Sequence, residues 1–197
     1  KQALPPLLHL ESRLQRLKNL MLTRYPCGSA WIVRYVMARD GKKKNADRLV
    51  KVDLGDADMQ RRSAEAEQER AIAIYDLLEE NLFQLNGSSG PYHLILRIEG
   101  RHIHFDIREP DDSQILQFFM AMGPLRRVIR DYFHVCETYY DAIRTKSPSQ
   151  IQAVDMGRRA LHNEGSELLQ IRLEGKVKTD FQTARRLFTL ICVLQSR

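Results

Sequence analysis

A segment between residues 147 and 175 is bounded at both ends by residues that begin and end helices. Ser147 and Gln150 form a capping box, and Pro148 occupies the first helical position. Gly175 is the residue type that commonly follows a helix. The segment therefore predicts one long helix around which the rest of the chain packs. At about 100° per residue, one stripe of this helix is apolar or glycine: Val154, Gly157, Leu161, Gly165 and Leu168.

Two glycines lie on this stripe, which we expect to be the buried face of the helix. A glycine in a helix interior costs about 1 kcal/mol of stability relative to alanine. We therefore expect another backbone to pass close to the helix at Gly157 and at Gly165.

A second, polar stripe runs along the edge of the first. Its members are Asp155, Arg159, His162 and Ser166, with Arg158 between the two stripes. Charged groups at the margin of a core are costly to desolvate unless they are paired, which favours a structural network in which Asp155 pairs with Arg159 and joins two helices. The alternative is an anion site in which Arg158 and Arg159 bind a carboxylate or phosphate. In that site His162 transfers a proton, and Asp155 orients the His162 ring.

Paired arginines recur on three successive predicted helices, at 126–127, 158–159 and 185–186. If these helices converge, some of their polar side chains line one pocket for an anion. The candidate ligand-binding residues are Arg130, Arg158, Arg159, Asn163 and Arg185, and the candidate catalytic residues are His162 and Asp155.

Alternating apolar and polar residues predict a small antiparallel sheet before these helices. The expected strands are 49–54, a hairpin over 91–108 and a return strand at 115–120. The expected helices are 63–81, one that begins at Pro124, the segment after Ser147, and one that begins at a second capping box of Thr179 and Gln182. These elements indicate an α+β fold in which a C-terminal helical bundle packs on the sheet.

The positive charge of the chain is concentrated near its start. Residues 1–46 hold ten Lys or Arg and two Asp or Glu, whereas the other 151 residues hold 21 and 23. We therefore expect a basic helical extension and linker over 1–46, a single α+β domain over 47–197, and no nucleic-acid binding by that main domain.

The expected location is the cytoplasm. No run reaches the roughly 18 apolar residues that a transmembrane helix needs. The three cysteines are widely spaced and show no metal-binding pattern, which is typical of reduced thiols.

Three polar residues at every second position of the predicted hairpin form a weak candidate metal site. His102, His104 and Asp106 project from one face of a strand, and His93 can face them from the neighbouring strand. The favoured interpretation is the polar face of an antiparallel sheet, with no metal.

Several long blocks of this sequence are similar to one known group of bacterial proteins. The blocks are ERAIAIYDLLEEN at 69–81, FDIR at 105–108, residues 126–132, residues 148–166 with DMGRR at 155–159, and TARRLFTLICVL at 183–194. Over about 49–194 the chain resembles the bacterial Uncharacterised Protein Family 0262. That resemblance implies no activity, substrate or cofactor, because none is established for the family.

The favoured function is an interaction or regulatory module that uses the Arg- and His-rich helix surface, with a protein partner or a second copy of the chain. The alternative is an enzyme or a sensor that binds an anionic small molecule. The sequence contains no phosphate loop, dinucleotide fingerprint, GxSxG or HExxH motif, so it identifies no cofactor and leaves open whether the protein is an enzyme. A closed, fully paired network around Arg159 favours the first function, and an open cleft with convergent, unpaired arginines favours the second.

Overall fold

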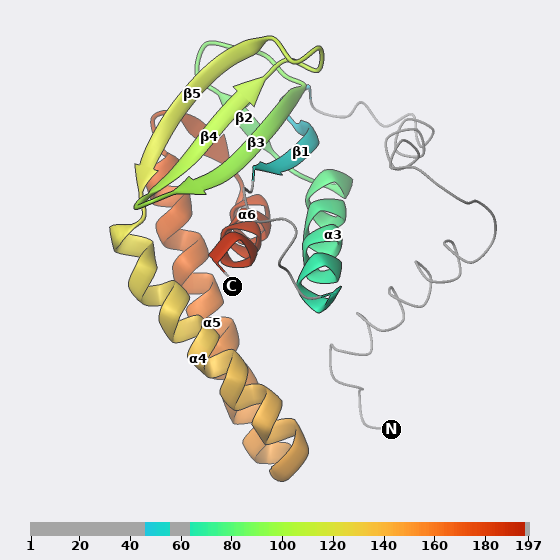
Figure 1. Cartoon of the computed structure of the whole chain (residues 1–197), viewed down its shortest axis with the longest axis vertical. Helices are drawn as coiled ribbons and strands as arrows, with labels where there is room; N and C mark the ends of the chain where they lie inside the picture. The colour runs from blue at the N-terminus through green and yellow to red at the C-terminus, as the bar shows by residue number, and fades with distance from the viewer. Residues whose placement is uncertain (1–45, 56–63, 196–197) are drawn as a thin grey trace, which may run out of the picture. The chain divides into compact units, whose positions relative to one another are not determined.

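The computed structural model describes residues 46–55 and 64–195 (Figure 1). The predicted basic extension lies almost wholly outside the described residues, so the division at residue 46 stays a prediction. The elements in chain order are β1 (Leu49–Gly55), α3 (Ala64–Glu79), β2 (Phe83–Leu85), β3 (Tyr92–Glu99), β4 (His102–Arg108), β5 (Gln114–Ala121), α4 (Gly123–Thr145), α5 (Pro148–Leu173), β6 (Val177–Thr179) and α6 (Phe181–Gln195). The predicted α+β class is confirmed.

The larger sheet has four strands in the order β1-β3-β4-β5. The predicted hairpin and return strand are confirmed, because β3, β4 and β5 pair antiparallel, with Leu96 opposite Phe105 and Phe105 opposite Phe118. Strand β1 pairs with β3 in parallel, which makes the sheet mixed. A parallel neighbour needs a crossover connection, and the segment that contains α3 provides it.

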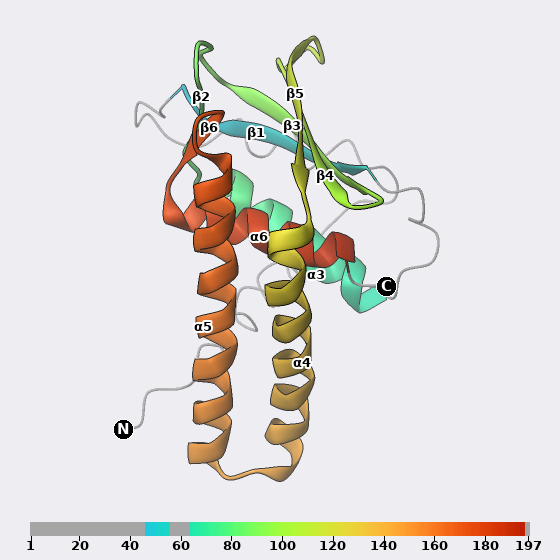
Figure 2. The same ribbon diagram turned by 90° about the vertical axis from the view of Figure 1, so that its left-hand side faces the viewer.

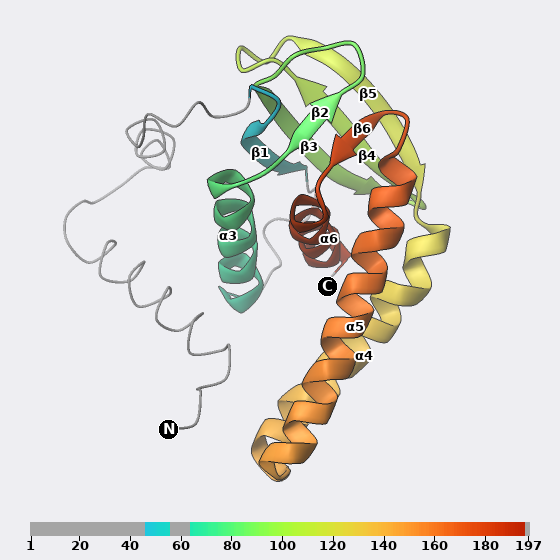
Figure 3. The same cartoon turned by 180° about the vertical axis from the view of Figure 1, so that it is seen from behind.

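One face of this sheet carries the core. Tyr92, Leu94, Leu96, Phe105 and Ile107 are fully buried on that face. Figures 1 and 3 show α6 and α3 on this side of the sheet. The opposite face carries the alternate, mostly polar residues of the same strands.

Helices α4 and α5 form a long antiparallel hairpin, whose loop end extends beyond α6 (Figure 2). The predicted capping box is confirmed, since the Ser147 backbone N donates to Gln150 Oε1 at 3.1 Å. Helix α5 runs unbroken from Pro148 to Leu173, and Gly175 follows it in the left-handed region with φ of 84°. No helix in the described part of the chain is long and apolar enough to cross a membrane.

A second sheet, which the sequence analysis did not predict, joins two three-residue strands. Strands β2 and β6 pair antiparallel, with Phe83 opposite Thr179. Thr179 belongs to β6, so the capping box predicted from Thr179 and Gln182 is wrong. Asp180 caps α6 instead, because its Oδ1 accepts a hydrogen bond from the Thr183 backbone N at 2.6 Å.

Candidate functional site

The ionic edge of α5 is a network centred on one carboxylate. Asp155 Oδ1 accepts from Arg158 Nη2 at 2.7 Å and from Arg158 Nε at 3.1 Å, while Asp155 Oδ2 accepts from Arg159 Nε at 2.7 Å. Burial raises the pKa of Asp155, but the hydrogen bonds and charges of the two arginines outweigh that effect and leave its pKa below the ordinary value. The carboxylate therefore stays ionised and holds both arginines.

Arg158 also joins α5 to α4. Its guanidinium carbon lies 5.4 Å from the centroid of the Tyr139 ring on α4, and the Tyr139 side chain is buried. The predicted pair of Asp155 and Arg159 forms, but both residues lie on α5, and it is Arg158 that makes the contact with α4.

Asp155→Asn is expected to lower the free energy of unfolding by about 2 kcal/mol, because it leaves the partly buried Arg158 without its charged acceptor. Urea denaturation measures this, with Asp141→Asn, an exposed acid on α4, as the control of equal charge change. The folded-state pKa of Asp155 is lowered, so its contribution is full above the ordinary pKa of 3.8 and is lost as the pH falls through the folded-state value. Equal stability of Asp155→Asn and wild type at neutral pH would contradict this account.

His162 lies at the junction of α4, α5 and α6 and is 8% exposed. Its Nε2 is 3.0 Å from Thr189 Oγ1, and that hydroxyl donates to the Arg185 backbone O at 3.1 Å. Because the hydroxyl proton is already used, His162 Nε2 is the donor in the first bond. The Nδ1 atom then carries the lone pair, and it has no hydrogen-bond partner among the described residues.

Aromatic rings enclose this imidazole. The ring centroids of Tyr132 and Phe188 lie 5.3 and 5.2 Å from that of His162, both in edge-on arrangements. Burial lowers the pKa of His162 to about 4, and the positive charges of Arg185 and Arg158 add to this effect. The ring is therefore neutral near pH 7 and sits in a packed core.

The structure brings together only part of the predicted ligand set. Arg185 on α6 is close enough to His162 to lower its pKa, and the buried Nε of Arg185 and Oδ1 of Asn163 have no hydrogen-bond partner among the described residues. Arg130 lies on the exposed face of α4, where it pairs with Asp131 at 3.2 Å. Convergence of three helices thus gathers His162 with Arg158 and Arg185 and leaves Arg130 outside.

Two cavities of about 420 Å³ lie elsewhere in the described residues. One lies between the end of α5 and β6. The other is a shallow groove along the α4–α5 hairpin, with Ala142 and Ala153 in its lining. Neither is lined by Arg158, Arg159 or His162.

The outer face of the larger sheet holds a second polar cluster, which the sequence analysis found only in part. His93 is 2% exposed, with Nδ1 2.6 Å from Asp112 Oδ1 and Nε2 2.8 Å from Asp53 Oδ2. Lys51 Nζ lies 3.5 Å from both carboxylates. The parallel register of β1 on β3 brings Asp53 beside His93. No local sequence pattern predicts that contact.

The weak metal candidates lie on the same face. His102 is exposed, whereas His104 packs against the Phe119 ring at 4.3 Å. Asp106 is buried and accepts from Arg108 Nη2 at 2.7 Å. Within residues 46–55 and 64–195, no three His, Cys, Asp or Glu side chains are placed to hold a metal ion.

The fold and these two clusters define an α+β protein with partly buried ionic networks and a projecting helical hairpin. The model of the uncharacterised protein family UPF0262 matches residues 46–197, and the chain belongs to that family. It is 48% identical to the UPF0262 protein of Rhodospirillum rubrum, over 80% of this chain and 98% of the relative. It is 55% identical to that of Azorhizobium caulinodans, over 75% of this chain and 93% of the relative. No solved structure is significantly similar to the chain.

Proposed function

We propose that this protein is a cytoplasmic interaction module that pairs with a second copy of itself through the loop end of the α4–α5 hairpin. Large apolar side chains remain exposed there: Tyr140 is 56% exposed, Ile143 45% and Met156 66%. Together with Arg159 these residues form what we call the hairpin patch. Their exposure on a projecting hairpin is the observation that carries the proposal.

Ile143 and Arg159 continue the side of the hairpin that α6 covers, and Met156 lies at the outer edge of the patch, about 120° around α5 from His162. Ile143 lies about three helical turns beyond Tyr132, whose ring is 6.2 Å from that of Phe188 on α6. Arg159 lies one turn before His162, which bonds to Thr189 on α6. Because the hairpin extends beyond α6, no helix of the described residues covers this side near the loop (Figures 1 and 2).

The α4–α5 hairpin of a second copy of the chain is the simplest group that could cover this side. Two antiparallel helices with an apolar side pack against another such pair to complete a four-helix bundle. A two-fold arrangement lets the same patch serve both copies. Tyrosine, methionine and arginine are residue types enriched at protein interfaces.

Arg159 has hydrogen-bond donors available for a contact with a second copy of the chain. Its Nε is fixed by Asp155, its side chain is 47% exposed, and its two terminal nitrogens make no hydrogen bond within the described chain. Those nitrogens are free to donate to a carboxylate or carbonyl of the second copy. Arg159 lines neither of the two cavities, which favours this role over an anion site in an open cleft.

Tyr140→Glu and Met156→Glu test the proposal, because each places a charge in the hairpin patch. The matched control is Ile171→Glu, at a position on α5 that is 61% exposed and outside the patch. We expect wild type and Ile171→Glu to be dimers, and the two patch variants to dimerise at least about tenfold more weakly. Size-exclusion chromatography with light scattering reads the mass. A dimer that tolerates Tyr140→Glu, or that Ile171→Glu disrupts equally, would contradict the proposal.

A further inference from the structure

The two edge strands of the four-stranded sheet differ in how they are protected. On β1, Leu49 N donates to Asn81 Oδ1 at 2.7 Å, and Asn81 Nδ2 donates to Leu49 O at 3.1 Å. The same strand carries the charged residues Lys51 and Asp53. Covered backbone groups and charged side chains prevent an edge strand from pairing with another chain, so the β1 edge is protected.

The β5 edge lacks this protection. Its eight residues, Gln114–Ala121, include no charged residue and no proline. The shift in its register with β4 lies at its first residues, between Gln114 and Leu116, and the rest of the strand pairs regularly. Figures 1 and 3 show no described helix or strand beyond β5 at this edge of the sheet. A long, uncharged edge strand is a template for pairing with a further strand.

The hydrogen-bond pattern shows which backbone groups face this free edge. Met122 N donates to Arg101 O at 2.8 Å, one step beyond the end of the β4–β5 ladder. Bonded and unbonded pairs alternate along an antiparallel ladder, so every second residue of β5 bonds to β4. The residues between them direct their N–H and C=O groups to the free edge, and these are Gln117, Phe119 and Ala121. Among the described residues, no turn, loop or other strand supplies a hydrogen bond to these groups.

The side chain of Phe119 is also left partly uncovered at this edge. It is 56% exposed, and its ring centroid lies 4.3 Å from that of His104 on the β4 side. Side chains opposite each other on paired strands are in contact. An apolar residue on an added strand would therefore cover the open side of the Phe119 ring.

The two ends of β5 carry opposite charges. Arg101 and Arg126 are exposed, and both bond to the backbone of Met122, which directly follows β5. The turn before β5 contains Asp111 and Asp112, which are also exposed. An extended segment that runs antiparallel to β5 therefore meets positive charge at its N-terminal end and negative charge at its C-terminal end.

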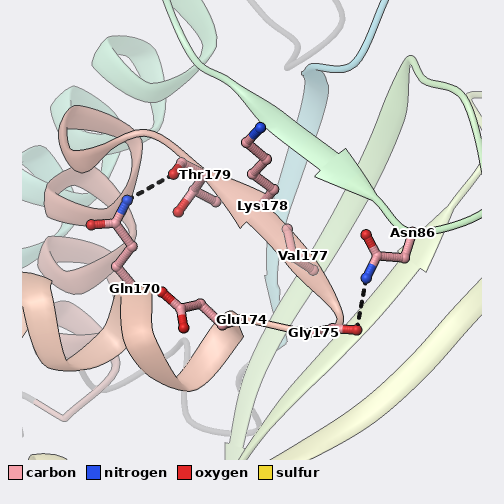
Figure 4. Close-up of a pocket in the computed structure, with 7 residues that line it drawn as sticks. All are labelled: Asn86, Gln170, Glu174, Gly175, Val177, Lys178 and Thr179. Atoms are coloured by element: carbon pink, nitrogen blue, oxygen red, sulfur yellow. Dashed lines mark hydrogen bonds between the residues drawn. The ribbon is translucent and has the colours of Figure 1, made fainter.

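The cavity beside β6 shows no such preference. Figure 4 shows that the Gln170 and Asn86 amides in its lining donate to backbone oxygens of the protein itself. Its charged residues, Glu174 and Lys178, are of opposite sign and both exposed. The edge of β5 therefore has the more specific chemistry for a partner.

We propose that β5 binds an extended segment of a different protein, which adds to the sheet as an antiparallel fifth strand. The fitted segment begins with acidic residues, continues with alternating apolar residues and ends with a basic residue. Backbone hydrogen bonds to Gln117, Phe119 and Ala121 supply affinity, and the end charges fix the direction. This inference goes beyond the proposed dimer, which uses the hairpin patch. A second copy on β5 as well would extend the assembly beyond a dimer.

Two peptides as long as β5 test the proposal on the full chain. Acetyl-EEVTVTVK-amide has the fitted order of charges, and acetyl-KKVTVTVE-amide has the opposite order. We expect fluorescence anisotropy of labelled peptides to show that the first binds at least about tenfold more tightly. Hydrogen exchange measured by NMR locates the contact, because the first peptide should slow amide exchange at Gln117, Phe119 and Ala121.

Matched variants separate the backbone contact from the charge contact. Gln117→Pro removes an N–H that faces the edge, a position where a strand tolerates proline, whereas Gln117→Thr keeps that N–H. The proline variant and Arg126→Glu should each bind the first peptide about tenfold more weakly, and the threonine variant should bind it as wild type does. Lys178→Glu, an exposed charge on β6, and Tyr140→Glu in the hairpin patch should leave its affinity unchanged.

Three results would overturn the proposal. The first is that neither peptide binds, and the second is that both bind equally. The third is that the amides of Gln117, Phe119 and Ala121 are already protected without peptide and lose that protection on dilution, which would assign the β5 edge to a second copy. Because Tyr140→Glu weakens only the proposed dimer, failure of that dimer is distinguishable from failure of the β5 site.

Discussion

Gly165→Ala is expected to lower the free energy of unfolding by about 2 kcal/mol. An added Cβ would overlap the ring of Phe188, which is fully buried and packed against the rings of Tyr132 and His162. Overpacking of this kind costs roughly 3 kcal/mol, and the higher helix propensity of alanine offsets about 1 kcal/mol of that. Urea denaturation at neutral pH measures the difference.

Gly157→Ala is the matched control, because it makes the same change eight residues earlier in the same helix. Gly157 is exposed, and a Cβ there meets no atom within 4 Å. We expect this variant to be more stable than wild type by up to about 1 kcal/mol. If both substitutions shift stability in the same direction, the packing described around Gly165 is wrong.

Acid is expected to destabilise the protein through His162. Its pKa is about 4 in the folded state against an ordinary value of 6.5, so the unfolded state binds the proton more readily. Stability is full above pH 6.5 and falls as the pH drops toward 4. The loss over this window is about 3 kcal/mol for this residue.

His162→Gln isolates this effect from the other groups that titrate in acid. Glutamine keeps a donor for Thr189 and has no proton to gain, so the loss of stability between pH 6.5 and 4 should be smaller in this variant. His134→Gln, at an exposed position on α4, should keep the slope of wild type. Parallel curves for His162→Gln and wild type would show that the imidazole does not titrate as described.

Local chemistry made much of the fold predictable. Pro148 and the Ser147 capping box set the start of α5, and strict alternation identified the β3–β4 hairpin. Non-local pairing was not predictable in the same way. Strand β6 is only three residues long and is stabilised by its partner β2, so its sequence carries no clear strand pattern.

Within the candidate site, the contacts that could be predicted are those set by the spacing of residues along one helix. Asp155 meets Arg158 and Arg159 because residues three and four apart are neighbours on a helix. Burial was harder to predict. The expected buried stripe contained Gly157, which is exposed, whereas His162 from the polar stripe is buried, because α6 packs nearer to that side of α5.

We expected another backbone to approach the helix closely at Gly165, but the group that does so is the Phe188 ring. The cluster of His93, Asp53 and Asp112 needed the fold itself, since three separate segments supply its members. Sequence spacing thus predicts contacts within one element and leaves contacts between elements to the tertiary structure.

Sedimentation equilibrium of the wild-type chain over a wide concentration range tests most directly whether the hairpin patch pairs two copies. The account predicts a reversible equilibrium that reaches twice the 23.0 kDa mass of one chain. A single species of 23.0 kDa at every concentration would contradict it.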